Sequence, residues 1–260
     1  MSFPARPGAQ TLVQDDDLQI RCLPGNGTGL VLVFTGVRHG LGGVPLDEFI
    51  GSASDAGQKH VLFISDMWRS WYSRSGLVDR ILGIVRNYCA NHAIDHIQTL
   101  GNSMGGYGAL LFCRHLKVDL ACAISPQISM HPDRIDERRW SWHRRDFGPD
   151  LAQTAVEGLG SLATRAVVVF GRDEARDSAQ MRLIPALPNL TLRGLRGCGH
   201  DLARRMKDAR LYGPLFAAIL GNDMEALDRV CTTYEQRLTS RLRHLLARLT
   251  GGLRFHFIRA

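Results

Sequence analysis

Two hydrophobic patterns alternate along the chain from residue 18 to about residue 220. Short runs that are apolar almost throughout indicate strands covered on both faces, as in a mostly parallel sheet. Helical patterns, such as those at 76–93 and 104–116, lie between these runs. The alternation predicts a doubly wound α/β fold. The predicted strands are LQIRCL (18–23), GLVLVFTG (29–36), HVLFISD (60–66), HIQTLG (96–101), DLACAIS (119–125), RAVVVFG (165–171) and NLTLRGL (189–195).

Two regions depart from this alternation and set the predicted domain organisation. The polar and aromatic segment 128–163 has no strand signal, and we interpret it as a helical or irregular cap inserted into a domain spanning 1–221. Residues 222–260 are predicted to form a basic amphipathic helical extension. Leucines recur along one stripe of that extension, at Leu238, Leu242, Leu245, Leu246 and Leu249.

The motif with the clearest chemical meaning is GNSMG at 101–105. It matches G-x-S-x-G and has a predicted strand before it and a helix after it, the context of a nucleophile elbow. A strand-to-helix turn this sharp strains the serine backbone, and small flanking residues avoid clashes. The turn exposes the hydroxyl at the sheet edge beside a helix N-terminus. Ser103 is therefore the predicted nucleophile.

Other glycine-rich motifs fit this segment less well. A dinucleotide-binding loop would need glycine at position 107, where the chain has Tyr107, and would normally follow the first strand. A phosphate-binding loop would need Gly-Lys followed by Ser or Thr, which is absent. The sequence thus predicts no cofactor, and the six scattered cysteines without a C-x-x-C pair predict no metal.

A serine nucleophile needs a base, and the base needs an acid. His200 directly follows the last predicted strand and is the only histidine between residues 143 and 244. The acid is expected in GRDEARDSAQ, after the strand 165–171. Asp177 is favoured, although it also resembles the N-cap of a following helix. Asp173 is the next candidate, and Glu174 is a third.

An oxyanion hole requires two backbone amides. Met104, directly after the serine, would provide one. Gly36 or Val37, in the loop after the strand 29–36, would provide the other.

Together these residues resemble the α/β-hydrolase superfamily over about 18–220. GNSMGGYGALLF, SPQ (125–127), SWY (70–72) and CGHDL are similar to a bacterial subgroup linked to glycan and polysaccharide modification. The resemblance implies an α/β-hydrolase fold and an acyl-enzyme on Ser103, with His200 as base and then acid. It does not identify the acyl acceptor.

Aromatic and basic residues suggest where a substrate would bind. Trp71 and Tyr72 follow a strand end, and Trp140 lies in the cap among arginines; each is also compatible with ordinary packing. A cap rich in arginine would favour an anionic or glycan-linked acyl ester or thioester. The cap arginines are Arg134, Arg138, Arg139, Arg144 and Arg145.

Composition and charge limit the location and the partners. The N-terminus lacks the apolar core of a secretory signal, so a cytoplasmic location is expected. No acidic residue follows Glu235, whereas arginines continue to Arg259. The segment 237–260 is therefore a candidate for peripheral membrane or homo-oligomer contact. No recognised motif accompanies the arginines, so no nucleic-acid partner is predicted.

The sequence therefore predicts a serine hydrolase acting on a carboxylic ester or thioester. An acyltransferase using the same triad is one alternative. A catalytically inert hydrolase-fold scaffold, binding a partner through its C-terminal helix, is the other.

Overall fold

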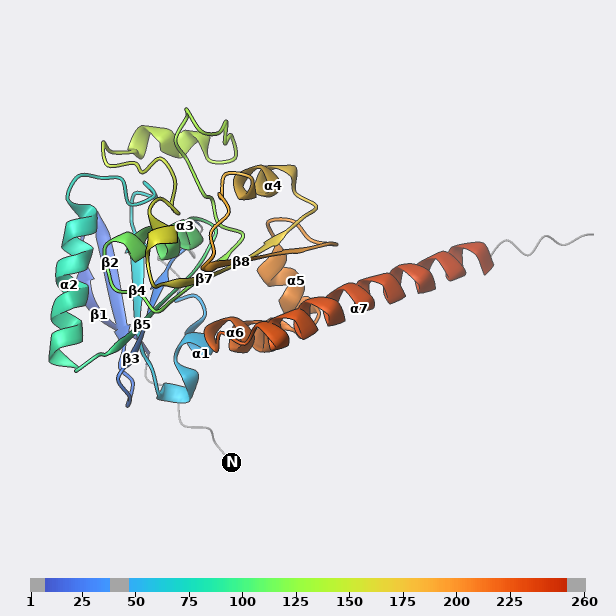
Figure 1. Cartoon of the computed structure of the whole chain (residues 1–260), viewed down its shortest axis with the longest axis horizontal. Coiled ribbons are helices and arrows are strands. Elements are labelled where there is room, and N and C mark those ends of the chain that lie inside the picture. The colour runs from blue at the N-terminus through green and yellow to red at the C-terminus, as the bar shows by residue number, and fades with distance from the viewer. Residues whose placement is uncertain (1–7, 38–46, 252–260) are drawn as a thin grey trace, which may run out of the picture.

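A computed structural model describes residues 8–37 and 47–251 of the chain, with side chains up to residue 240 (Figure 1). Its centre is an eight-stranded sheet in the order β1-β2-β4-β3-β5-β6-β7-β8. The antiparallel edge consists of β1 and β2, and all later pairs are parallel. The strands are β1 (Gln10–Gln14), β2 (Leu18–Leu23), β3 (Gly29–Phe34), β4 (His60–Asp66), β5 (His96–Asn102), β6 (Leu120–Ile124), β7 (Arg165–Gly171) and β8 (Leu190–Leu195).

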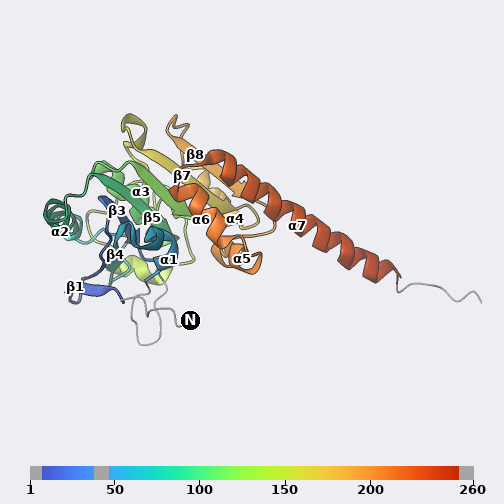
Figure 2. The ribbon, with the colours of Figure 1, turned by 90° about the horizontal axis from the view of Figure 1, so that it is seen from below.

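Helices cover both faces of the sheet, which accounts for the continuous apolar strands. Side chains of alternate positions on β3 enter two separate cores: Leu32 and Phe34 face α2 and α3, and Val33 faces α6. Figure 2 shows α6 and α7 along the β7–β8 side of the sheet. The helices are α1 (Ile50–Ala53), α2 (Leu77–Asn91), α3 (Met104–Leu111), α4 (Ala175–Met181), α5 (Leu202–Asp208), α6 (Tyr212–Leu220) and α7 (Met224–Gly251), and the short 3₁₀ turns are η2 (Asp55–Gly57), η3 (Phe112–Arg114), η4 (Ser141–Asp146) and η5 (Leu159–Ser161).

The segment 128–163, called the cap segment from here on, joins β6 to β7. Apart from η4 and η5 it has no regular secondary structure. Figure 1 shows its chain passing over the end of the molecule that also carries α4. Ile128, Met130 and Leu159 anchor it in the core that contains α2 and α3. The cap segment is thus packed on the domain over the carboxyl ends of the strands.

The first half of the C-terminal helix α7 packs on the body of the domain. Leu227 and Tyr234 are buried, and Leu238 lies against Gly197. The helix then extends away from the sheet (Figure 1). The remaining leucines of the predicted stripe lie outside the described side chains. In the described ranges, no helix is long and apolar enough to cross a membrane.

The predicted α/β architecture is confirmed, and all seven predicted strands are present within one or two residues of their expected bounds. The sequence missed β1, whose residues are mostly exposed. A short edge strand buries little side-chain surface, so its hydrophobic pattern is weak.

Candidate active site

Ser103 lies at the turn between β5 and α3, with backbone angles φ 59° and ψ −120°. This left-handed conformation is rare for a residue with a side chain, and a nucleophile elbow requires it. The flanking glycines allow the turn to pack closely. A Cβ atom on Gly101 would lie 2.1 Å from the carbonyl carbon of Gly105, and one on Gly105 would lie 2.0 Å from the carbonyl oxygen of Phe34. The predicted elbow conformation is present.

His200 lies between β8 and α5, and its ring bridges the serine to an acid. Nε2 is 2.9 Å from Ser103 Oγ, and Nδ1 is 3.0 Å from both carboxylate oxygens of Asp177. A carboxylate can only accept hydrogen bonds, so the proton belongs on Nδ1. The lone pair of Nε2 then accepts from the serine hydroxyl. This is the tautomer that a general base needs.

The structure brings only one of the three acid candidates to the histidine. Asp177 is fully buried in the first turn of α4. The alternative in which it caps the following helix is wrong, because α4 begins at Ala175 and Glu174 occupies the N-cap position. Asp173 instead accepts a hydrogen bond from the amide of Gly197 at 2.9 Å. The site therefore contains the contiguous row Ser103–His200–Asp177.

The candidate oxyanion-hole residues border the elbow. Met104 is the first residue of α3. Gly36 lies beside the elbow, because a Cβ atom on it would be 3.4 Å from the carbonyl oxygen of Asn102. Its amide, however, donates to Glu48 Oε2 at 3.3 Å. Because Gly36 N–H already has this partner, Val37 is the better candidate for the second amide.

Glu48 is a partly buried acid that the sequence gave no reason to expect here. Burial raises the pKa of its carboxyl from 4.5 to about 7, although the amide of Gly36 opposes this shift. Below pH 4.5 the carboxyl is protonated in both folded and unfolded chains. As the pH rises to about 7, the carboxyl loses its proton in the unfolded chain before it does so in the folded one. The free energy of unfolding therefore falls by about 3 kcal/mol.

Replacing Glu48 by glutamine removes this titration and keeps an oxygen that accepts from Gly36. We expect the Glu48→Gln protein to exceed wild type in free energy of unfolding by up to about 3 kcal/mol at pH 8. The gain should vanish near pH 4.5. Urea unfolding at both pH values measures it, with the exposed Glu157→Gln as control. A gain that is equal at both pH values would contradict the expected role of Glu48.

Gln127 is a site residue that sequence reasoning missed. It is fully buried just after β6, and its Nε2 donates to Ser103 Oγ at 3.1 Å. Its Oε1 accepts a 3.4 Å hydrogen bond from Trp71 Nε1. Gln127 lies three residues beyond the end of β6, in the SPQ segment, whose resemblance assigned it no role, so only its position in the fold identifies that role. Gln127 and Trp71 together form a polar contact beneath the nucleophile.

The loop after β4 holds Trp71 in this position. Asp66 is buried at the strand end and accepts hydrogen bonds from the amides of Trp68, Ser70 and Tyr72. Trp71 has a left-handed backbone, with φ 54°. These bonds to one carboxylate offset the backbone strain of the loop.

Of the three predicted substrate residues, Trp71 and Tyr72 are fully buried, whereas Trp140 is half-buried and its role stays a prediction. Tyr72 is fully buried, and its ring packs edge-on against Phe34 and Phe112. It is therefore a core residue, the second of the two roles considered for it. Trp140 is half-buried and packs edge-on against Trp142 of the cap segment.

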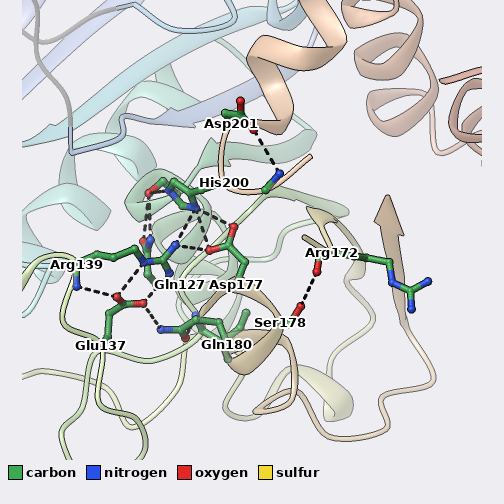
Figure 3. Close-up of polar contacts among 12 residues, drawn as sticks. Gln127, Glu137, Arg139, Arg172, Asp177, Ser178, Gln180, His200 and Asp201 are labelled. Carbon is green, nitrogen blue, oxygen red and sulfur yellow. Dashed lines mark hydrogen bonds and ion pairs between the residues drawn. The ribbon is translucent and has the colours of Figure 1, made fainter. Parts of the chain in front are cut away.

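The cap segment also contacts the acid of the row (Figure 3). Arg139 donates to Asp177 Oδ1 and lies 3.4 Å, Nη1 to Nδ1, from His200. Its other nitrogens donate to both oxygens of Glu137, at 2.7 and 2.9 Å. Arg139 is one of the cap arginines that the sequence suggests for contact with an anionic substrate. The structure places it behind the histidine.

The remaining cap arginines mostly pair with groups of the cap segment itself. Arg134 donates to Gln153, Arg138 to Asp136, and Arg144 to the carbonyl of Glu137. The described side chains include no group of three or more His, Cys, Asp or Glu residues able to hold a metal ion.

No family model matches the chain. No curated protein matches it at the sequence level.

Solved structures do match. An α/β-hydrolase enzyme from the metagenome of Mar Chica lagoon sediments has a TM-score of 0.52 and 18% identity, covering 85% of this chain and 100% of its own. An S-formylglutathione hydrolase from Agrobacterium tumefaciens has a TM-score of 0.54 and 14% identity, and the match covers 85% of this chain and 95% of the hydrolase. The capsule O-acetyltransferase of Neisseria meningitidis serogroup A has a TM-score of 0.54 and 13% identity, and the match covers 80% of this chain and 93% of the acetyltransferase. The sheet order and these similarities together show that the chain has the α/β-hydrolase fold.

Proposed function

We propose that the protein is a serine hydrolase that cleaves a carboxylic ester or thioester through an acyl-enzyme on Ser103. The observation that carries this proposal is the hydrogen-bonded row from Ser103 Oγ through His200 to Asp177, with the serine on a strained elbow. Hydroxyl, imidazole and carboxylate in this order form the arrangement that activates a serine.

The contacts define the steps. His200 Nε2 takes the hydroxyl proton as Ser103 Oγ attacks the acyl carbon. The acyl oxygen becomes an oxyanion and accepts hydrogen bonds from the amides of Met104 and Val37. Collapse of this intermediate breaks the bond to the leaving alcohol or thiol, which receives the proton from His200. Water then attacks the acyl carbon while His200 takes its proton. The bond from Ser103 Oγ to the acyl group breaks, the acid is released, and Ser103 regains its proton from His200.

Covalent labelling with a fluorophosphonate probe tests this proposal. Wild-type protein should be labelled, and peptide mapping should place the label on Ser103. Ser103→Ala should abolish labelling, and His200→Ala should slow it by several orders of magnitude. A panel of p-nitrophenyl esters from acetate to octanoate would then define the acyl chain. Folded wild-type protein that remains unlabelled would overturn the proposal and favour the inert scaffold binding through α7.

Acyl transfer is a second candidate function, and the low solvent exposure of the nucleophile favours it. Ser103 is only 6% exposed, and Gln127 donates a hydrogen bond to its hydroxyl. Excluding water from an acyl-enzyme favours its capture by another acceptor. The similarity in fold to a capsule O-acetyltransferase is consistent with this candidate.

Acceptor competition distinguishes the two reactions. Under transfer, adding hexoses and N-acetylhexosamines to p-nitrophenyl acetate should speed p-nitrophenol release. Mass spectrometry should then detect acetylated sugar. Under hydrolysis, release should be independent of the sugar, and acetate should be the only acyl product.

A further inference from the structure

The cap segment contributes a second buried ion pair directly behind the candidate triad. Glu137 has a fully buried side chain, and Arg139 beside it is 13% exposed. The guanidinium of Arg139 donates one hydrogen bond to each carboxylate oxygen of Glu137 and a third to Asp177. A bidentate arginine–carboxylate pair fixes the plane of the guanidinium, and therefore the direction of the remaining N–H.

The same pair is tied to helix α4 by a separate contact. Gln180 lies three residues after Asp177 on α4, and its Nε2 donates to Glu137 Oε2 at 3.2 Å. Gln180 Oε1 in turn accepts from the amides of Ile128 and Ser129, at 2.8 and 3.0 Å. Figure 3 shows Glu137 and Arg139 lying against Asp177 and Gln180. The first residues of the cap segment and the helix carrying the acid are thus locked together.

The charges in this cluster are permanent. Burial alone would lower the pKa of Arg139, but hydrogen bonds and charges from Glu137 and Asp177 outweigh it and raise that pKa. Burial would raise the pKa of Glu137, and the hydrogen bonds and charge of Arg139 reverse this, so its pKa is lowered. Arg139 remains a cation and Glu137 an anion across the neutral pH range.

This arrangement has a specific consequence for His200. An arginine on Asp177 would by itself cancel the negative charge that stabilises the imidazolium formed during attack. Glu137 restores that charge, because it adds one unit of negative charge directly behind Arg139. With Glu137, Arg139 and Asp177 charged, the cluster carries a net charge of −1 facing a neutral histidine. It becomes neutral when the histidine is protonated.

We propose that Glu137 and Arg139 are a pair of positioning residues: Arg139 orients the Asp177 carboxylate toward His200, and Glu137 compensates the charge that Arg139 brings. The inference rests on the proposed serine-hydrolase function. Under this inference, two residues of the cap segment help to set the basicity of His200. No substrate contact by either residue is required.

Opposite shifts in pH dependence distinguish this role from simple structural support. The rate constant of fluorophosphonate labelling reports serine activation, and its acid limb reports protonation of His200. Glu137→Gln leaves Arg139 uncompensated, so the midpoint of this limb should fall by about one pH unit. Arg139→Gln removes the cation 3.4 Å from the ring and should raise the midpoint by a similar amount.

The double variant Glu137→Gln/Arg139→Gln should return the midpoint to near the wild-type value, because the net charge around the histidine is again −1. Arg138→Gln is the matched control, since its 75% exposed side chain pairs with Asp136 in the same segment. It should leave the midpoint unchanged. Other charged groups near His200 stay constant throughout: Asp201, which pairs with Arg204 and Arg205, and Glu174 beside Gly199.

Each result decides the question. Shifts of Glu137→Gln and Arg139→Gln in the same direction, or no shift in either, would overturn the inference. If Arg139→Gln does not fold, Glu137→Gln alone decides: a fall in its midpoint supports the inference, and an unchanged or raised midpoint contradicts it. Absence of labelling in folded wild-type protein would instead count against the proposed function itself. The two failures are therefore distinguishable.

Discussion

Replacing Asp177 by asparagine should reduce kcat/KM for ester hydrolysis by about 10⁴-fold while leaving the fold intact. Arg139 donates to Asp177 Oδ1, so the asparagine must turn its carbonyl oxygen toward the guanidinium. Its NH₂ group then faces His200 Nδ1. A donor at that point forces the ring proton onto Nε2, which can no longer accept from Ser103. Steady-state kinetics with p-nitrophenyl acetate measure the loss.

Asp173→Asn and Glu174→Gln are the matched controls for this prediction. Asp173 is bound to the Gly197 amide, and Glu174 is the N-cap residue of α4. Both variants should retain kcat/KM within about threefold, because neither touches the imidazole. A 10⁴-fold loss in Asp173→Asn, with activity kept in Asp177→Asn, would refute the assignment of the acid. Circular dichroism and a melting curve for each variant would exclude unfolding as the cause.

The parts of this structure that could be predicted depend on local patterns. The central strands are covered on both faces, so their apolar runs identify them directly. The elbow combines a strand, a small-residue turn and a helix within a few positions, so Ser103 is identified by sequence alone. His200 was found by its order relative to the last strand. The edge strand β1 was missed, because its exposed residues carry almost no pattern.

The residues that surround the triad could not be predicted, because long-range contacts determine their roles. Gln127 and Glu48 reach the site through the path of the chain, and no motif assigns either of them a role there. The charge of Arg139 suggests contact with an anionic substrate and nothing more. Its actual partners depend on how the irregular cap segment folds back onto α4. An irregular segment has no periodicity from which such a path can be inferred.

Replacing Gly105 by alanine should destabilise the protein by at least about 3 kcal/mol, lowering the melting temperature by roughly 6 °C or more. Helix propensity alone predicts the opposite, because alanine favours a helix interior over glycine by about 1 kcal/mol. Close packing outweighs this preference and makes the substitution destabilising. The new Cβ would lie 2.0 Å from the Phe34 carbonyl oxygen, so α3 must move away from β3. That movement would separate the amide of Met104 from the loop after β3, and phosphonate labelling should fall with stability. Gly83→Ala on the exposed side of α2, where a Cβ meets nothing within 4 Å, should instead stabilise the protein slightly. If both alanine variants were stabilised, the elbow would not be packed as closely as the structure shows, and its glycines would have no steric role.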